Sequence, residues 1–157
     1  MKRAKGFTLM ELLVVIAVLG LLMGLLMPAL SGARYSAHKA RVRSEVKQIE
    51  TAWKAYYQDY RSLPGGINDM DVGNGLDVLH GTDKGNNQRE IRYMEFDDRA
   101  LADGFRDKWG GVYRISLDDN SSGEVTTSTG TVMRAVAVWS VGRDGEEGTE
   151  DDITSWE

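Results

Sequence analysis

One carboxylate stands at the start of a long apolar run, and its position limits what it can do. Glu11 is followed by the 19 residues from Leu12 to Leu30, none of which carries a charge. Such a run is long enough to cross a bilayer as a helix, and a carboxylate in it is costly unless a cation lies near. No Lys or Arg lies inside the run. A backbone amine at position 7, freed by cleavage after Gly6, is the nearest source of positive charge.

The residues before this run favour such a cleavage. The segment from Met1 to Gly6 contains Lys2, Arg3 and Lys5 and no acid, and a basic flank of this kind stays on the cytoplasmic side of a membrane. A secretory signal has its apolar region before the cleavage site, whereas here the apolar region follows Gly6. Cleavage would therefore release a short leader and leave the membrane helix attached to the protein.

A second group of side chains that could bind a ligand lies near the C-terminus. Six of the nine residues from 144 to 152 are acidic, and glycines interrupt them. Carboxylates at this density repel one another unless a cation lies among them. Calcium takes about six to eight oxygen ligands from carboxylates and carbonyls, so the loop predicts a calcium site. The loop lacks the Asp-x-Asp-x-Asp-Gly spacing of an EF-hand.

A long helix and a small sheet must position these two groups. Apolar residues recur at steps of four and three in the second half of the helix, which is the pattern of an amphipathic face; they are Val42, Val46, Ile49, Trp53, Tyr56 and Tyr60. The sequence predicts a helix from Phe7 to Ser62, stopped by Leu63-Pro64-Gly65-Gly66. Its first half is apolar all round and contains Gly20, Gly24 and Pro28, where a kink is expected because proline removes a backbone hydrogen bond.

The rest of the chain has the pattern of short strands joined by turns. Residues 77–80 predict a helical turn, and residues 107–111 and 118–123 predict turns because they are rich in Asp, Asn, Ser and Gly. The predicted strands are 91–96, 112–117 and 132–141, the last of them long, apolar and central. The fold class is therefore α+β.

Composition excludes several functions. The net charge is −5, and loss of the leader leaves 16 basic against 24 acidic side chains, a net charge of −8. An acidic protein is a poor general binder of nucleic acid, so no nucleic-acid partner is expected. The chain has no cysteine, and His38 and His80 are 42 residues apart, which argues against a disulfide and a transition-metal site. No catalytic motif occurs, and we expect no enzyme activity.

The N-terminal segment Gly6-Phe7-Thr8-Leu9-Met10-Glu11-Leu12-Leu13-Val14-Val15-Ile16 resembles the class III signal of type IV prepilins and type II secretion pseudopilins. The resemblance implies cleavage between Gly6 and Phe7 by a prepilin peptidase and N-methylation of Phe7. It also implies that Glu11 pairs with the terminal amine of a neighbouring subunit during filament assembly.

Later segments resemble the major pseudopilin family of type II secretion systems. Asp107-Lys108-Trp109-Gly110-Gly111-Val112-Tyr113 is similar to the family turn Asp-Pro-Trp-Gly-Asn-Pro-Tyr, from which it departs at Lys108, Gly111 and Val112. The closing Asp152-Ile153-Thr154-Ser155-Trp156 is similar to the end of the family's calcium loop. The resemblance implies calcium ligands at Asp144 and Asp152, with Asp151 and Thr149 as further ligands, and a pilin-like fold closed by this loop.

These inferences predict three parts: a leader (1–6), a transmembrane and assembly helix (7–30), and a periplasmic pilin-like domain (31–157) that includes the amphipathic helix half 31–62. The resemblance implies a single-pass protein of the bacterial inner membrane that meets lipid first and then assembles with copies of itself. Its other implied partners are the prepilin peptidase, minor pseudopilins and an inner-membrane assembly platform. The predicted function is that of a structural subunit of a type II secretion pseudopilus.

Two alternatives remain open at this point. The same features suit a subunit of a type IV pilus used for adhesion, motility or DNA uptake. A membrane-anchored enzyme or ligand-binding module is the second alternative, and it requires a pocket with convergent polar groups in residues 64–157.

Overall fold

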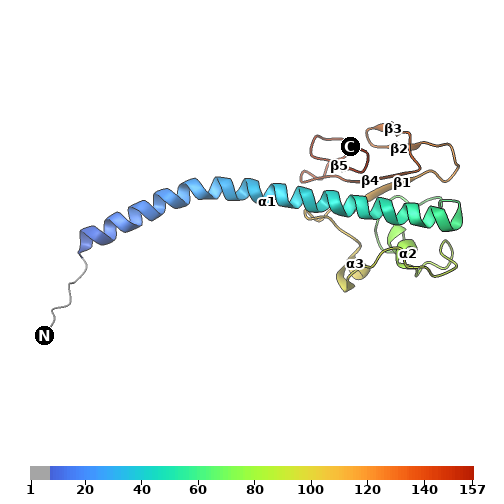
Figure 1. The fold of residues 1–157 in the computed structure, drawn as a ribbon, viewed down its shortest axis with the longest axis horizontal. Helices are drawn as coiled ribbons and strands as arrows, with labels where there is room; N and C mark the ends of the chain where they lie inside the picture. The colour runs from blue at the N-terminus through green and yellow to red at the C-terminus, as the bar shows by residue number, and fades with distance from the viewer. Residues whose placement is uncertain (1–7) are drawn as a thin grey trace. The chain divides into compact units, whose positions relative to one another are not determined.

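The computed structural model of the chain describes residues 8–157. The elements in chain order are α1 (Leu9–Tyr60), α2 (Gly75–His80), α3 (Asp98–Asp103), β1 (Arg114–Leu117), β2 (Val125–Thr127), β3 (Gly130–Val132), β4 (Val136–Ser140) and β5 (Ile153–Thr154). All pairings among the described strands are antiparallel. A long N-terminal helix with small antiparallel sheets confirms the predicted α+β, pilin-like fold (Figure 1).

The chain divides into two compact units, residues 1–38 and 39–157. In the first unit, the described part of α1 continues without interruption through Gly20, Gly24 and Pro28. Its large apolar side chains are open to the surroundings, with exposed fractions from 47% at Val15 to 88% at Leu9. By length and composition α1 can cross a membrane. The predicted domain limits at residues 6/7 and 30/31 stay predictions.

The second unit has its hydrophobic core along one face of α1. The predicted stripe is confirmed, because Val42, Val46, Ile49 and Trp53 are fully buried and Tyr56 is nearly so. These side chains pack with buried residues of the later elements, which are Leu63, Met70, Leu76, Val78, Leu79, Tyr113, Ile115, Val136, Val138 and Ile153. Burial of each large apolar side chain contributes about 1.5–3 kcal/mol, so this face holds the small domain on the helix.

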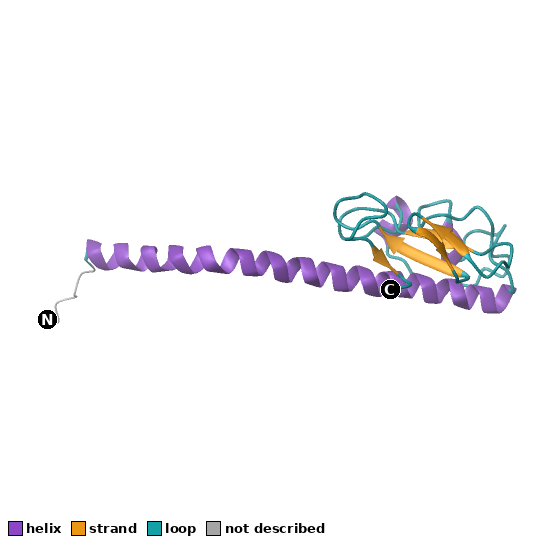
Figure 2. Cartoon of the chain, turned by 90° about the horizontal axis from the view of Figure 1, so that it is seen from above, coloured by secondary structure: helices purple, strands orange, loops and turns teal. Residues whose placement is uncertain are grey.

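The main sheet has the order β1-β4-β5. All five residues of β4 are buried, which confirms that this segment is central. Arg114 pairs with Trp139 in the β1–β4 ladder, and Ser140 pairs with Ile153 in the β4–β5 ladder. A second sheet consists of the hairpin β2–β3. Within the second unit, the strands lie on one side of α1 and the short helices α2 and α3 on the other (Figure 1). Figure 2 shows the strands beside the C-terminal part of α1.

Three predicted elements differ from the structure. Residues 91–96 form no strand; instead the backbone N–H groups of Tyr93 and Met94 both donate to the Leu79 carbonyl, which places this segment against the end of α2. The predicted strand 132–141 is broken at residues 133–135, where the Arg134 N–H donates to the Val132 carbonyl. This bend sends residues 130–132 and 136–140 into different sheets.

The third difference is the end of the long helix. Helix α1 ends at Tyr60 rather than at Ser62, because Arg61 adopts a left-handed backbone with φ of 58° and a non-glycine residue in this conformation interrupts a right-handed helix. Helix α3, the hairpin β2–β3 and strand β5 were not predicted. They are only two to six residues long, which is too short for a reliable hydrophobic period.

Candidate functional site

Glu11 lies in the first turn of α1 and has a partner in its own chain. Its Oε2 atom accepts hydrogen bonds of 2.9 Å from both the backbone N–H and the hydroxyl of Thr8. The Thr8 hydroxyl in turn accepts the Glu11 N–H at 3.2 Å. This reciprocal arrangement is a capping box, which satisfies backbone donors at the start of a helix. The Thr-x-x-Glu spacing is visible in the sequence and could have predicted it.

The capping box fixes where the Glu11 carboxylate points but leaves it exposed. The predicted processing residues Gly6 and Phe7 lie outside the described residues, so the predicted pairing of Glu11 with an amine stays a prediction. The apolar surface that follows Glu11 is open, since no residue in the most apolar 18-residue stretch of α1 is buried. A surface of this kind marks a membrane or protein contact.

The predicted calcium ligands lie together in the C-terminal loop, but they are not equivalent. Asp151 is bonded within the loop: its Oδ2 accepts the backbone N–H groups of Arg143 at 2.6 Å and Asp144 at 3.2 Å, and its Oδ1 accepts the Thr149 hydroxyl at 2.7 Å. The Thr149 hydrogen bond foremost, with those backbone donors, lowers the pKa of Asp151 to about 2. Asp151 therefore braces the loop as a carboxylate.

Asp152 has the opposite character. Its Oδ2 accepts the Gly148 N–H at 2.8 Å, whereas its Oδ1 is buried without a hydrogen-bond partner. Burial foremost, and then the charges of Asp151, Asp144 and Glu147, raise the pKa of Asp152. An unpartnered buried carboxylate oxygen among like charges is an unfavourable arrangement that a bound cation relieves.

The acidic side chains of the loop do not form a metal site by themselves. The described residues hold no group of three or more His, Cys, Asp or Glu side chains placed to bind a metal. A cation here would need backbone carbonyls or the Thr149 hydroxyl beside Asp144 and Asp152, and calcium accepts such oxygens. Gly142, Gly145 and Gly148 have φ between 70° and 86°, so the loop turns at residues that adopt this conformation without strain.

A buried carboxylate fixes the base of this loop. The Asp107 Oδ1 atom accepts the N–H groups of Trp109 and Gly111, each at 2.9 Å, and Oδ2 accepts the Ser140 hydroxyl at 2.5 Å. Ser140 Oγ also accepts the Gly142 N–H at 3.2 Å. The predicted turn at 107–111 is thus confirmed, and it is tied to the point where the chain leaves β4 for the acidic loop.

The C-terminal tail is held by charged side chains that sequence reasoning missed. The Glu50 carboxylate, which is 4% exposed, lies 2.9 Å from Lys54 Nζ, 3.3 Å from Arg134 Nη1 and 3.5 Å from Lys47 Nζ. Lys47 and Arg134 both donate to the Ser155 carbonyl. These contacts fasten the tail of a chain that has no cysteine.

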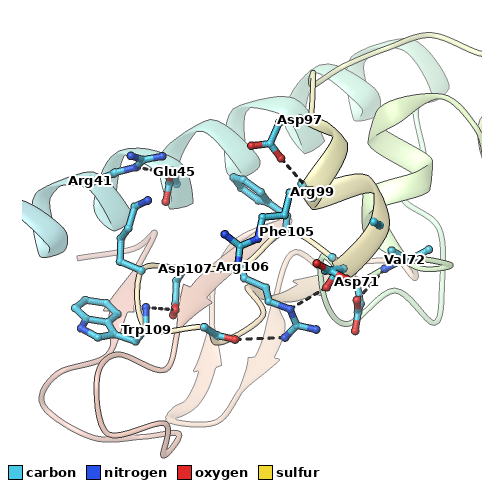
Figure 3. A pocket seen from close by; sticks show the side chains of 16 residues that line it. Arg41, Glu45, Asp71, Val72, Asp97, Arg99, Phe105, Arg106, Asp107 and Trp109 are labelled. Atoms are coloured by element: carbon cyan, nitrogen blue, oxygen red, sulfur yellow. Dashed lines mark hydrogen bonds and ion pairs between the residues drawn. The ribbon is translucent and has the colours of Figure 1, made fainter.

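A groove of about 900 Å³ lies in the second unit beside α1 and α3 (Figure 3). Arg41 and Glu45 of α1 form an ion pair at its edge, and Asp107 and Trp109 lie on another side. The lining residues include four cations and five acids but no Ser, Thr, Cys, His or Tyr.

Comparisons with known proteins agree with these features. Residues 1–27 match the family model of the prokaryotic N-terminal methylation motif. The chain is 31% identical to the type II secretion system core protein G of Klebsiella michiganensis, over 97% of this chain and 92% of that protein. The proteins of the same name from Escherichia coli K12 and Vibrio cholerae are 30% and 26% identical over 98% and 99% of this chain, and 92% and 94% of their own lengths. No solved structure matches the chain.

The methylation motif and the fold agree on a pilin-like protein with a single apolar anchor helix, a class of structural subunits rather than enzymes. Within that class, identity of about 30% over almost the whole length decides the family. The chain belongs to the family of type II secretion system core protein G, the major pseudopilins, and is a pseudopilus subunit. The predictions of the family and of a non-enzymatic function are therefore confirmed.

Proposed function

We propose that residues 7–30 insert this subunit into the bacterial inner membrane, with the leader in the cytoplasm and residues 31–157 in the periplasm. A prepilin peptidase then cuts between Gly6 and Phe7 and methylates the new terminal amine. The match to the N-terminal methylation motif supports this order of events. The same motif supports the orientation, since residues 31–62 are basic as well as the leader and the charge of the flanks alone does not decide it.

The observation that carries the proposal is the exposed apolar surface of α1 with Glu11 at its start. Lipid covers this surface first. When subunits leave the membrane, the apolar helices of neighbouring copies cover one another and form a helical filament for protein secretion. Minor pseudopilins and an inner-membrane assembly platform are the further partners that we propose.

Glu11 sets the register between neighbouring helices in this proposal. Its carboxylate pairs with the amine of Phe7 in the next subunit, and the low dielectric of an apolar helix bundle strengthens such a pair. The Thr8 capping box supports this role, since it holds Oε2 and so orients the carboxylate at the helix start.

Calcium would bind in the C-terminal loop through Asp144 and Asp152, with the Thr149 hydroxyl and Asp151 as further oxygen ligands. Such an ion supplies positive charge to a loop whose carboxylates repel one another. The buried, unpartnered Oδ1 of Asp152 supports this proposal. The bound ion would fix the loop that follows β4, in addition to the contacts of Asp107 and Glu50.

Filament assembly by two Glu11 variants tests the proposal. Glu11→Val should still insert into the membrane, but it should form few filaments visible by electron microscopy. Glu11→Gln keeps an amide that can complete the capping box but removes the charge, so it separates capping from ion pairing. Normal filaments from Glu11→Gln would contradict the proposed pair with the Phe7 amine.

Mass spectrometry of the native protein tests the processing step separately. We expect a mature chain that begins with N-methylated Phe7 and has lost residues 1–6. A Gly6→Ala variant is a suitable comparison, since it alters the cleavage site and leaves the described helix unchanged. An assembled filament whose subunits still begin with Met1 would contradict the processing step.

A further inference from the structure

A row of cations runs along one face of α1 in the second unit. Lys39, Arg43, Lys47 and Lys54 are four, four and seven residues apart, and residues at these spacings share one face of a helix. Arg134, from the bend between β3 and β4, joins them through its contact with Glu50 at 3.3 Å. We refer to Lys39, Arg43, Lys47, Lys54 and Arg134 as the basic stripe.

The basic stripe keeps an excess of positive charge in the folded chain. A single carboxylate, that of Glu50, is shared by Lys47, Lys54 and Arg134. No carboxylate of the described residues lies within ion-pair distance of Lys39 or Arg43. The paired cations also stay accessible, since the side chains of Lys47 and Lys54 are 47% and 57% exposed. This concentration of cations is unusual in a chain with a net charge of −5.

The C-terminal loop has the complementary charge. Glu147 pairs with Arg114 at 3.0 Å, and Asp151 and Asp152 are bonded within the loop. Glu146 and Glu150 are exposed, and neither forms an ion pair with a described residue, including those of the basic stripe. We refer to Glu146 and Glu150 as the acidic tip.

We propose that the basic stripe of one subunit binds the acidic tip of a second copy of this chain. The inference rests on the proposed filament, because the two surfaces differ and a contact between them is heterologous. Heterologous contacts leave one free surface of each kind at the ends of the assembly, so they propagate into helical filaments. Opposite charges at such a contact favour the correct orientation and register of neighbours.

A second copy fits the stripe better than an anionic lipid surface does. Lys39 and Lys54 are 15 positions apart, which is about 22 Å along the helix axis. The headgroup layer on each side of a bilayer is roughly 5–8 Å thick, and screening limits its reach to about 8 Å beyond that at physiological salt. A stripe that runs along a helix axis contacts such a layer over its full length only if the helix lies flat on the membrane.

Disulfide trapping between co-expressed full-length chains tests the contact. The natural sequence has no cysteine, so one tagged chain carries Arg43→Cys and another carries Glu146→Cys. A disulfide can then form only between these two chains or between two copies of the same variant. We expect a linked heterodimer in assembled filaments under mild oxidation. The matched control replaces Arg43→Cys by Gln48→Cys, which is exposed on α1 five residues away and therefore on another face. The control should be linked to Glu146→Cys at least about threefold less.

Charge reversal provides the second measurement. Arg43→Glu should lower linking between Lys39→Cys and Glu150→Cys chains by about threefold or more, the effect that loss of one ion pair has on affinity. Glu146→Arg in the partner chain should restore it. Raised salt should weaken linking in the natural background, because exposed charges are screened.

The outcomes separate this inference from the proposed function. Filaments that form normally while the Arg43–Glu146 pair is linked no better than its control would overturn the contact and leave the filament proposal standing. Protection of Arg43→Cys from a water-soluble thiol reagent in anionic but not in neutral vesicles, with linking to Glu146→Cys no better than the control, would identify lipid as the occupant and overturn the contact as well. Absence of filaments from the natural sequence would overturn both.

Discussion

The Ser140 hydroxyl donates a 2.5 Å hydrogen bond to the Asp107 carboxylate, which lies 33 residues earlier in the chain. Both side chains are buried, with Ser140 fully so and Asp107 7% exposed. The bond joins the end of β4 to the turn before β1, and the same Ser140 oxygen accepts the Gly142 N–H. The first residues of the acidic loop are therefore held by the core and not by the loop alone.

Removal of the Ser140 hydroxyl should destabilise the second unit. In Ser140→Ala, one Asp107 oxygen and the Gly142 N–H lose their partner, and a buried polar group left unpaired costs about 1–3 kcal/mol. Chemical unfolding of the full chain in detergent, followed by tryptophan fluorescence, measures the loss. Ser128→Ala is the control, because Ser128 is exposed and such changes stay within about 0.5 kcal/mol. Equal unfolding midpoints for the two variants would contradict the role given to Ser140.

Loss of the Glu50 charge should destabilise the attachment of the C-terminal tail. In Glu50→Gln, Lys47, Lys54 and Arg134 repel one another without a shared carboxylate. These cations are 37–57% exposed and remain hydrated, so we expect a loss of about 1–2 kcal/mol, below that for a fully buried pair.

The control for Glu50 is Glu90→Gln. Glu90 pairs with Lys84 at 2.8 Å, with both side chains more than half exposed, and an exposed pair contributes about 0–1 kcal/mol. Added salt should recover part of the loss in Glu50→Gln, because it screens the repulsion between the cations. A loss no larger than that of the control, or one that salt does not change, would contradict the proposed role of Glu50.

Sequence reasoning succeeded where the signal is local. The step from Val42 to Val46, Ile49 and Trp53 follows the helical period, and all four side chains are buried as predicted. The density of Asp and Gly in residues 107–111 likewise predicts a turn without knowledge of its neighbours. In these segments the residues that determine the structure lie within a few positions of one another.

Sequence reasoning failed where partners are distant. Glu50 and Arg134 are 84 residues apart, and no pattern near either residue specifies the other. The break at residues 133–135 was missed because an apolar segment shows no alternation that would mark a change of sheet. The Thr8–Glu11 capping box is a local feature, but it was missed because the segment was interpreted for its membrane properties.

The Asp151 carboxylate should make stability depend on acidity. Its pKa is lowered from 3.8 to about 2 in the folded chain. A lowered carboxyl pKa gives stability that is fully present above the unfolded value and is lost as pH falls from about 4 to about 2. Because the group is near the surface, we expect a contribution below about 1 kcal/mol.

Thermal midpoints between pH 2 and pH 6, without added calcium, measure this dependence. Thr149→Val removes the hydrogen bond that lowers the pKa most, so its midpoint should fall less steeply between pH 4 and pH 2 than that of the natural sequence. Asp152, whose pKa is raised, changes stability in the opposite sense on acidification. Parallel curves for Thr149→Val and the natural sequence would show that Asp151 does not brace the loop.

Removal of calcium should lower the thermal midpoint of the full chain in detergent. A ligand present at a hundred times its dissociation constant stabilises the folded state by about 2.7 kcal/mol, which corresponds to roughly 5–10 °C for a chain of this size. Chelation should cause that decrease in the natural sequence, and magnesium should not reverse it, because magnesium requires a tighter octahedral shell.

Two variants show whether the effect belongs to the C-terminal loop. Asp152→Asn replaces the residue whose buried Oδ1 lacks a partner, so its midpoint should no longer respond to calcium. Glu124→Gln changes an exposed acid outside the loop and should keep the full response. Because Asp152→Asn also removes repulsion from Asp144, Asp151 and Glu147, its midpoint in chelator should equal or exceed that of the natural sequence. A midpoint in the natural sequence that is independent of calcium would show that repulsion in the loop is tolerated without an ion.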